Sequence, residues 1–197
     1  GNIVGLIKGS GKGPGIAKTG HKDESGMIVK RVEADGRLRV RSVGGAHPWA
    51  IGEGPVDLLG QKEVVTGILS VGTKHVSSES SAFVAKGEKA LTWEMVWIET
   101  KLSPDALKAK GVGIGTKAVV GRHRKQPLLL GDYICGYGLD CKAAIGIMIT
   151  VMSQASGMRP LRDTYFIAST EEEVGAVGAT YGIGELPVDT AIALEVG

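Results

Sequence analysis

The feature of this sequence that most constrains its fold is a change of pattern along the chain. Between residues 27 and 121, short apolar and β-branched runs are separated by Gly, Pro and Ser, which is typical of antiparallel strands joined by tight turns. Residues 1–26 and 122–197 instead contain strand-like runs joined by glycine loops or helical segments, the pattern of an α/β layer with a largely parallel sheet. We therefore predict an α/β domain in two pieces, with an antiparallel β domain inserted between them.

The inserted segment contains a hairpin and one short helix. Residues 27–32 and 37–43 flank the turn sequence EADG, and Asp-Gly is among the strongest short-range hairpin signals. Further strand-like runs follow, one of them at 80–86. A helix is predicted between Ser103, an N-cap residue followed by proline, and Gly111, which ends it. These elements predict a small antiparallel β-barrel.

The piece that follows the insertion is predicted to alternate between helix and strand. Its pattern gives a helix at 142–153, a strand at 164–169, a glycine-rich helix at 174–183 and a strand at 191–196. The longest apolar stretch, 143–152, is shorter than the roughly 18 to 20 residues that a membrane span needs. We therefore expect a buried helix there, and no membrane partner.

Composition and charge narrow the class of protein further. Apolar residues make up 43% and charged residues 22%, which predicts a globular chain rather than a disordered one. The net charge of +2 is too small to suggest a nucleic-acid partner. Two cysteines are too few for a disulfide framework, and no signal-peptide pattern opens the sequence. We therefore expect a cytoplasmic protein.

Ionisable residues follow several of the strand-like runs, on the side where open α/β sheets place their ligands. His21 and Asp23 are two residues apart in an extended segment, so they face the same way. A metal-bound imidazole usually donates its second ring N–H to a carboxylate, which Asp23 can supply. Asp140 precedes an apolar helix, where it is either a ligand or the N-cap of that helix.

More carboxylates follow the last two predicted strands. Glu171, Glu172 and Glu173 are adjacent and repel one another, so a cation would relieve them, although a solvated loop is the alternative. Glu195 interrupts an apolar run, and a buried carboxylate is rarely left without a partner. Together with the histidine, these carboxylates form the donor set of a two-metal hydrolytic site.

At this point the sequence resembles the M42 family of cocatalytic metallo-aminopeptidases, the glutamyl and tetrahedral aminopeptidase group within the zinc-peptidase clan. The resemblance implies a zinc-peptidase-like α/β/α domain with an inserted dimerisation module. It also implies removal of N-terminal residues from short peptides. Dimers would assemble into large hollow particles, with a dodecamer expected. The motifs that carry it are HKDESG (21–26), LDCKAAIG (139–146), EEEVGAVGA (171–179) and ALEVG (193–197).

The resemblance also implies a role for each site residue. His21 and Glu195 would bind one of two divalent metal ions, with Asp140 bridging them. Glu173 would bind the second ion, Glu172 would be the general base, and Asp23 would orient the imidazole. Zinc is the expected metal, and cobalt is the alternative.

The sequence departs from the family pattern at several positions, and it leaves two other functions open. Cys141 stands where the family commonly has Asp or Asn, and Glu195 where Asp is more common, so the preferred metal can differ. The family takes its last ligand, a histidine, from beyond Gly197, so we expect this chain to be part of a longer protein. One alternative is a metal-dependent deacylase or carboxypeptidase of the same clan. The other is a non-catalytic assembly subunit or fragment.

Overall fold

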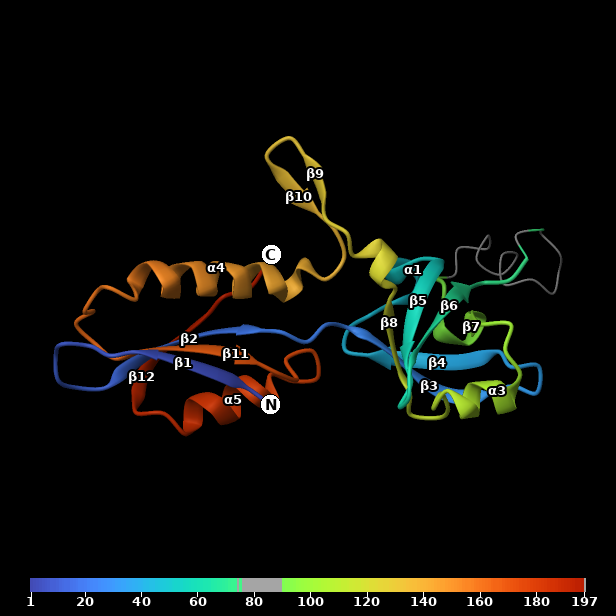
Figure 1. Cartoon of the computed structure of the whole chain (residues 1–197), viewed down its shortest axis with the longest axis horizontal. Helices are drawn as coiled ribbons and strands as arrows, with labels where there is room; N and C mark the ends of the chain where they lie inside the picture. The colour runs from blue at the N-terminus through green and yellow to red at the C-terminus, as the bar shows by residue number, and fades with distance from the viewer. Residues whose placement is uncertain (74, 76–89, 197) are drawn as a thin grey trace. The chain divides into compact units, whose positions relative to one another are not determined.

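A computed structural model of the chain describes residues 1–73, 75 and 90–196, so the strand-like run predicted at 80–86 lies outside the described residues. The chain divides into two compact units (Figure 1). The first comprises Gly1–Glu24 and Gly138–Gly197, and the second comprises Ser25–Tyr137.

Residues 122–137, which we placed with the α/β piece on sequence grounds, group with the second unit. Hydrogen bonds from the 3-10 turn η2 (Arg122–Arg124) explain this grouping. The backbone N–H of Arg122 donates to Asp57 Oδ2 at 2.9 Å, and Arg124 Nη2 donates to the carbonyl of Ile51 at 2.6 Å. These bonds tie the segment to the inserted β domain.

The first unit is a four-stranded sheet in the order β1-β11-β2-β12. β1 is antiparallel to β11, and the other two pairs are parallel, which confirms the largely parallel sheet predicted from the sequence. Two helices pack on opposite faces of this sheet (Figure 1). The elements are β1 (Ile3–Ile7), β2 (Gly15–His21), α4 (Leu139–Ala155), β11 (Thr164–Ser169), α5 (Val177–Gly184) and β12 (Val188–Ala193).

The helix predicted at 142–153 is α4, which begins earlier and is buried on one side only. Ala144 and Met148 are buried and face Gly20 of β2, where the helix packs against this strand. Ile147 and Ile149 on the other side are exposed, so the helix that we expected to be buried is buried on one face only. None of the helices in the described part of the chain has the length and apolar character needed to cross a membrane.

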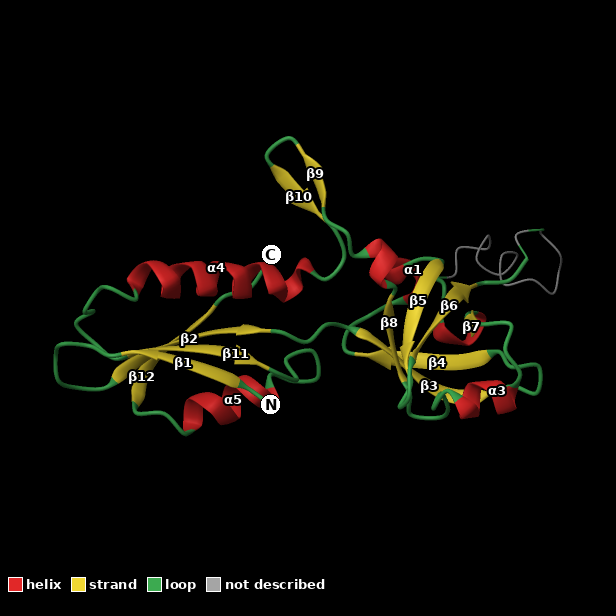
Figure 2. Ribbon diagram, in the orientation of Figure 1, coloured by secondary structure: helices red, strands yellow, loops and turns green. Residues whose placement is uncertain are grey.

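The second unit is a closed antiparallel barrel in the strand order β3-β4-β7-β6-β5-β8, as the turn-rich sequence predicts (Figure 2). Its strands are β3 (Gly26–Val32), β4 (Leu38–Val43), β5 (Gly54–Leu59), β6 (Val64–Ser70), β7 (Trp97–Glu99) and β8 (Lys117–Val120). The remaining elements are α1 (Pro48–Ile51), η1 (Trp93–Met95), α3 (Pro104–Ala109) and a separate hairpin of β9 (Leu128–Leu130) with β10 (Tyr133–Cys135).

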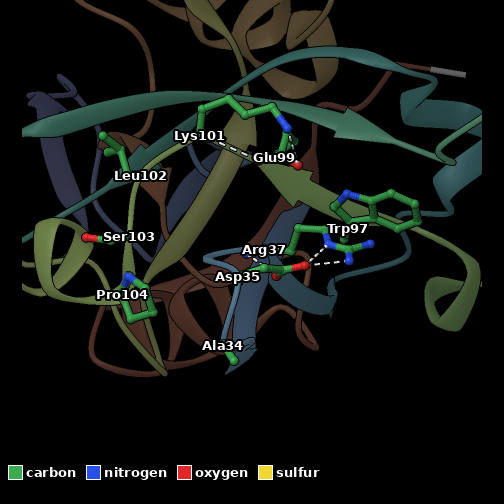
Figure 3. Close-up of a pocket in the computed structure, with 9 residues that line it drawn as sticks. All are labelled: Ala34, Asp35, Arg37, Trp97, Glu99, Lys101, Leu102, Ser103 and Pro104. Atoms are coloured by element: carbon green, nitrogen blue, oxygen red, sulfur yellow. Dashed lines mark hydrogen bonds and ion pairs between the residues drawn. The ribbon is translucent and has the colours of Figure 1, made fainter.

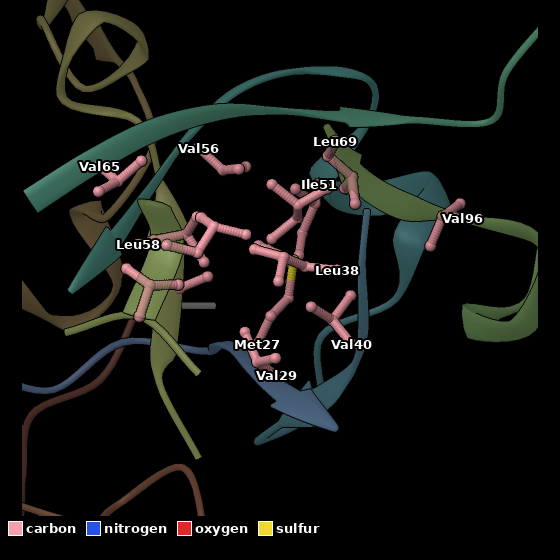
Figure 4. Packing of buried hydrophobic residues seen from close by; sticks show 14 residues of the cluster. Met27, Val29, Leu38, Val40, Ile51, Val56, Leu58, Val65, Leu69 and Val96 are labelled. Atoms are coloured by element: carbon pink, nitrogen blue, oxygen red, sulfur yellow. The ribbon is translucent and has the colours of Figure 1, made fainter. Parts of the chain in front are cut away.

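The barrel core is built from alternate residues of its strands, because every second side chain of a strand points inward. Val56 and Leu58 of β5 and Leu38 and Val40 of β4 are fully buried, and they converge with side chains of the other strands (Figure 4). The predicted EADG turn joins β3 to β4, and its Gly36 has a φ of +84°. A Cβ at this glycine would lie 1.9 Å from the carbonyl oxygen of Leu102, so both conformation and space require glycine here.

Candidate metal centre

Three of the predicted ligands, His21, Asp140 and Glu195, come together with Cys141 at one edge of the sheet in the first unit. β2 ends at His21, which is 2% exposed, and Asp140 and Cys141 lie at a kink near the start of α4, where their backbone angles are not helical. Glu195 follows the end of β12. One ligand atom from each of these four residues lies within 4.8 Å of the others. Because β2 and β12 are parallel, their carboxyl ends meet at this edge, as expected for an α/β sheet.

One ring nitrogen of His21 faces three carboxylates. Its Nε2 lies 3.0 Å from Asp140 Oδ1, 3.8 Å from Glu172 Oε2 and 3.7 Å from Glu195 Oε2. Burial lowers the pKa of His21, but the hydrogen bond with Asp140 and the nearby negative charges outweigh it, so the pKa is raised. Burial and a hydrogen bond with Glu195 raise the pKa of Asp140. These shifts show that negative charge is concentrated at this position, where a cation would be stabilised.

The other ring nitrogen is held by Asp23. His21 Nδ1 is 3.1 Å from the backbone carbonyl oxygen of Asp23 and 3.6 Å from its carboxylate. The two carboxylate oxygens of Asp23 accept the backbone N–H groups of Glu172 and Glu173, each at 3.3 Å. Asp23 therefore contacts the histidine and also anchors the segment with the two glutamates, a second role that the sequence analysis missed.

Asp140 contacts His21 rather than capping its helix. The N-cap residue of α4 is Gly138, and no side chain caps the helix there. The bond between Asp140 and Cys141 is a cis peptide. The Cys141 thiol is buried and donates to the carbonyl of Leu194 at 3.2 Å, and burial raises its pKa to about 11. In the absence of a cation, Cys141 is therefore a neutral thiol beside the carboxylates.

Glu173 differs from the other predicted ligands. Among the residues that the structure describes, the group of converging donors consists of His21, Asp140, Cys141 and Glu195, without the carboxylate of Glu173. Its backbone is nevertheless fixed beside the group through Asp23. The Glu172 carboxylate lies closer to the histidine than that of Glu171, for which no such contact is found among the described residues.

An ion pair also supports the site. Lys142 Nζ lies 2.7 Å from Glu24 Oε2, so the start of α4 is tied to the segment that follows His21. Neither residue is a predicted site residue, although they lie inside the motifs HKDESG and LDCKAAIG. The donor set of the whole site, imidazole with carboxylates, suits zinc or cobalt and therefore fits a divalent metal.

A pocket of about 580 Å³ lies in the barrel unit and contains no predicted site residue (Figure 3). Its charged side chains pair with each other. Arg37 Nε donates to Asp35 Oδ2 at 2.6 Å, and Lys101 Nζ lies 3.2 Å from Glu99 Oε2. Because these side chains form ion pairs with one another, the residues that line this pocket do not form a group of metal-ligand atoms like the one around His21.

A model of the M42 glutamyl aminopeptidase family matches residues 1–197. The chain belongs to the M42 glutamyl aminopeptidase family. This M42 chain is 26% identical to the lysyl aminopeptidase of Pyrococcus furiosus over 204 residues, which cover 100% of the chain and 54% of that protein. The resemblance seen in the sequence motifs is thereby confirmed.

Solved structures give the same result for the fold of this M42 chain. Aminopeptidase APDkam598 from the archaeon Desulfurococcus kamchatkensis matches with a TM-score of 0.81 at 26% identity, over 100% of this chain and 51% of that one. The TET1 peptidase of Pyrococcus horikoshii, which can assemble into a tetrahedron or a large octahedral shell, matches with a TM-score of 0.83 at 22% identity. That match covers 99% of this chain and 56% of the other. The chain spans about half the length of the curated relatives it matches.

Proposed function

We propose that this chain carries the metal centre of a two-metal aminopeptidase that removes N-terminal residues from short peptides. His21 and Glu195 would hold one divalent ion, and Asp140 would be a ligand shared with a second. Glu173, whose backbone N–H is bonded to Asp23, would hold the second ion. Zinc is the expected metal and cobalt the alternative. The observation that carries the proposal is the convergence of a buried imidazole with carboxylates from three separate segments.

Glu172 is the proposed general base. Its Oε2 lies 3.8 Å from His21 Nε2, and its backbone N–H is bonded to Asp23, which supports a place for this residue beside the metal ligands. When bound, divalent ions polarise the scissile carbonyl and make water more acidic. Glu172 takes the proton of the attacking water and then gives it to the leaving amine. Asp23 keeps both the histidine and this glutamate in position.

We further propose that the barrel unit mediates self-association in the cytoplasm, first into dimers and then into a hollow dodecamer. The support is the fold that this chain shares with a peptidase that assembles into a tetrahedron or an octahedral shell. In this proposal the barrel unit has no part in the chemistry, since every residue with a proposed catalytic or metal-binding role belongs to the first unit.

The test compares Glu172→Gln with Glu171→Gln in the full-length protein. The first variant should lose about 10²- to 10⁴-fold in kcat, because a general base contributes that much, and should retain its metal. The neighbouring variant removes the same charge from a residue without a proposed role, and should keep wild-type turnover. Substrates are aminoacyl 4-nitroanilides, and the same compounds with an N-acetyl group should not be cleaved.

Two results would contradict the proposal. Wild-type kcat in Glu172→Gln with full metal content would exclude this residue as the base. Equal release of 4-nitroaniline from the N-acetylated and free compounds would exclude an aminopeptidase, because the free amine would then have no part in recognition. Release of acetate from the N-acetylated compounds would instead favour the related deacylase activity.

A further inference from the structure

The segment that carries the two proposed catalytic glutamates is a tight connection between β11 and α5 (Figure 1). Glu171 and Ala176 within it have φ values of 59° and 55°. A left-handed backbone conformation is unfavourable for residues with a Cβ, so two such residues in one short connection need contacts that hold them there. Asp23 supplies such contacts at the middle of the segment.

The two ends of this segment are joined by a backbone hydrogen bond, from the N–H of Gly178 to the carbonyl of Thr170 at 3.0 Å, and by one side chain, that of Asn2. Asn2 precedes β1, and β1 pairs with β11 so that Ile3 lies opposite Ala168, which places Asn2 beside the end of β11. Its Oδ1 accepts the backbone N–H of Thr170 at 3.1 Å and the hydroxyl of the same residue at 3.4 Å. Its Nδ2 donates to the carbonyl of Gly178 at 2.7 Å. One amide therefore joins the start of the segment to the first turn of α5.

Two glycines of α5 leave the space that the Asn2 side chain occupies. A Cβ at Gly178 would lie 2.7 Å from Asn2 Oδ1, and one at Gly182 would lie 2.7 Å from Asn2 Nδ2. The Cβ at Gly178 would also lie 2.1 Å from the carbonyl oxygen of Thr170. The two positions are four residues apart, so they share one helix face. This face therefore fits closely around a side chain that is both donor and acceptor.

We infer that Asn2 is a positioning residue, which sets the place of Glu172 and Glu173 by closing the 170–178 segment at both ends. An asparagine suits this task because its amide has two donors and one carbonyl acceptor, whereas an aspartate offers acceptors only. The inference rests on the proposed function for the roles of the two glutamates. The contacts of Asn2 that support the inferred clamp do not depend on the proposed function.

The test uses Asn2→Ala, Asn2→Asp and Ser10→Ala in the full-length protein. Ser10 donates to the carbonyl of Pro160 at 3.3 Å, so its variant removes a comparable side-chain to backbone bond beyond the other end of β1. Amide hydrogen exchange at Thr170 reports the clamp, and kcat and KM at saturating zinc report positioning. Measured metal content shows whether lower turnover is due to metal loss.

In Asn2→Ala we expect fast exchange at Thr170 and a kcat about 10- to 100-fold lower at nearly unchanged KM, because small displacements of catalytic groups cost that much. Asn2→Asp retains the acceptor for Thr170 and loses the donor to Gly178, so its Thr170 amide should stay protected while kcat falls by less. Ser10→Ala should match the wild type in both measurements.

Wild-type protection of Thr170 in Asn2→Ala would overturn the clamp. Fast exchange with wild-type kcat would overturn the positioning role. If Asn2→Ala does not fold, wild-type kcat in Asn2→Asp, with metal content unchanged, is the result that overturns it. A wild-type protein without peptidase activity would refute the proposed function, and the exchange measurement would still decide the clamp.

Discussion

Two buried polar side chains, His21 and Asp57, show what separates a site from a structural contact. They are 2% and 6% exposed. Each oxygen of the Asp57 carboxylate accepts a hydrogen bond within the barrel unit. The donors are the Thr66 hydroxyl and the Arg122 backbone N–H, each at 2.9 Å. His21 instead faces three carboxylates, an arrangement that a cation would stabilise. Both residues are buried, so burial does not distinguish the candidate metal ligand from the structural aspartate. The groups that contact each side chain do.

The partners of Asp57 also set a pH dependence for the barrel. Burial raises its pKa, but the bonds from Arg122 and Thr66 outweigh burial, and the pKa is lowered. A carboxylate whose pKa is lower in the folded state stabilises the fold above its unfolded pKa of about 3.9. This contribution is lost as the pH falls from that value through the lower pKa of the folded state.

The change Asp57→Asn should reduce the stability of the barrel by about 1–3 kcal/mol at pH 7, because the side-chain NH₂ would face a donor. Hydrogen exchange of peptides from β5, β6 and β8 measures this, and the difference from wild type should shrink toward pH 3. Asp132→Asn, in an exposed turn, is the control and should leave exchange unchanged. Equal exchange rates of Asp57→Asn and the wild type at pH 7 would show that this carboxylate does not contribute to the stability of the barrel.

At the scale of single elements, α5 offers a matched pair of glycines. An alanine at Gly178 would place its Cβ 2.1 Å from the Thr170 carbonyl, whereas one at Gly184 would meet nothing within 4 Å. Gly178→Ala should therefore displace the segment with Glu172 and lower kcat about tenfold or more. Gly184→Ala should keep wild-type kcat. Measured kcat values that are the same for both variants would show that the close approach of α5 does not affect the segment.

The sequence predicts those elements that are defined by local signals. The EADG hairpin, the helix after Ser103 and the strand at 164–169 all occur, and Ser103 Oγ accepts the backbone N–H of Ala106 at 3.2 Å as an N-cap does. The last strand is less well predicted. β12 spans Val188–Ala193, so Glu195 lies beyond its end rather than within it.

The features that could not be predicted from the sequence are contacts between segments that are far apart in the chain. Asn2 lies 168 residues from Thr170 and 176 from Gly178, and only the pairing of β1 with β11 brings them together. The amides that Asp23 accepts are about as remote, being 149 and 150 residues away. Local patterns carry no information on such pairings, although they place the candidate ligands at strand ends.

At the scale of the whole molecule, the α/β unit and the barrel unit have separate tasks. The candidate ligands run from His21 to Glu195 and are interrupted in the sequence by the barrel, but all of them belong to the first unit. The insertion therefore leaves the site residues within one folded unit. The family match extends over residues 1–197 and so includes both units.

The most direct measurement is native mass spectrometry of the full-length protein, which counts metal ions per subunit and subunits per particle in one sample. We expect close to two zinc or cobalt ions per subunit, in a particle of many subunits. A folded protein that carries no tightly bound metal would contradict the two-metal centre and leave a non-catalytic assembly subunit as the better description.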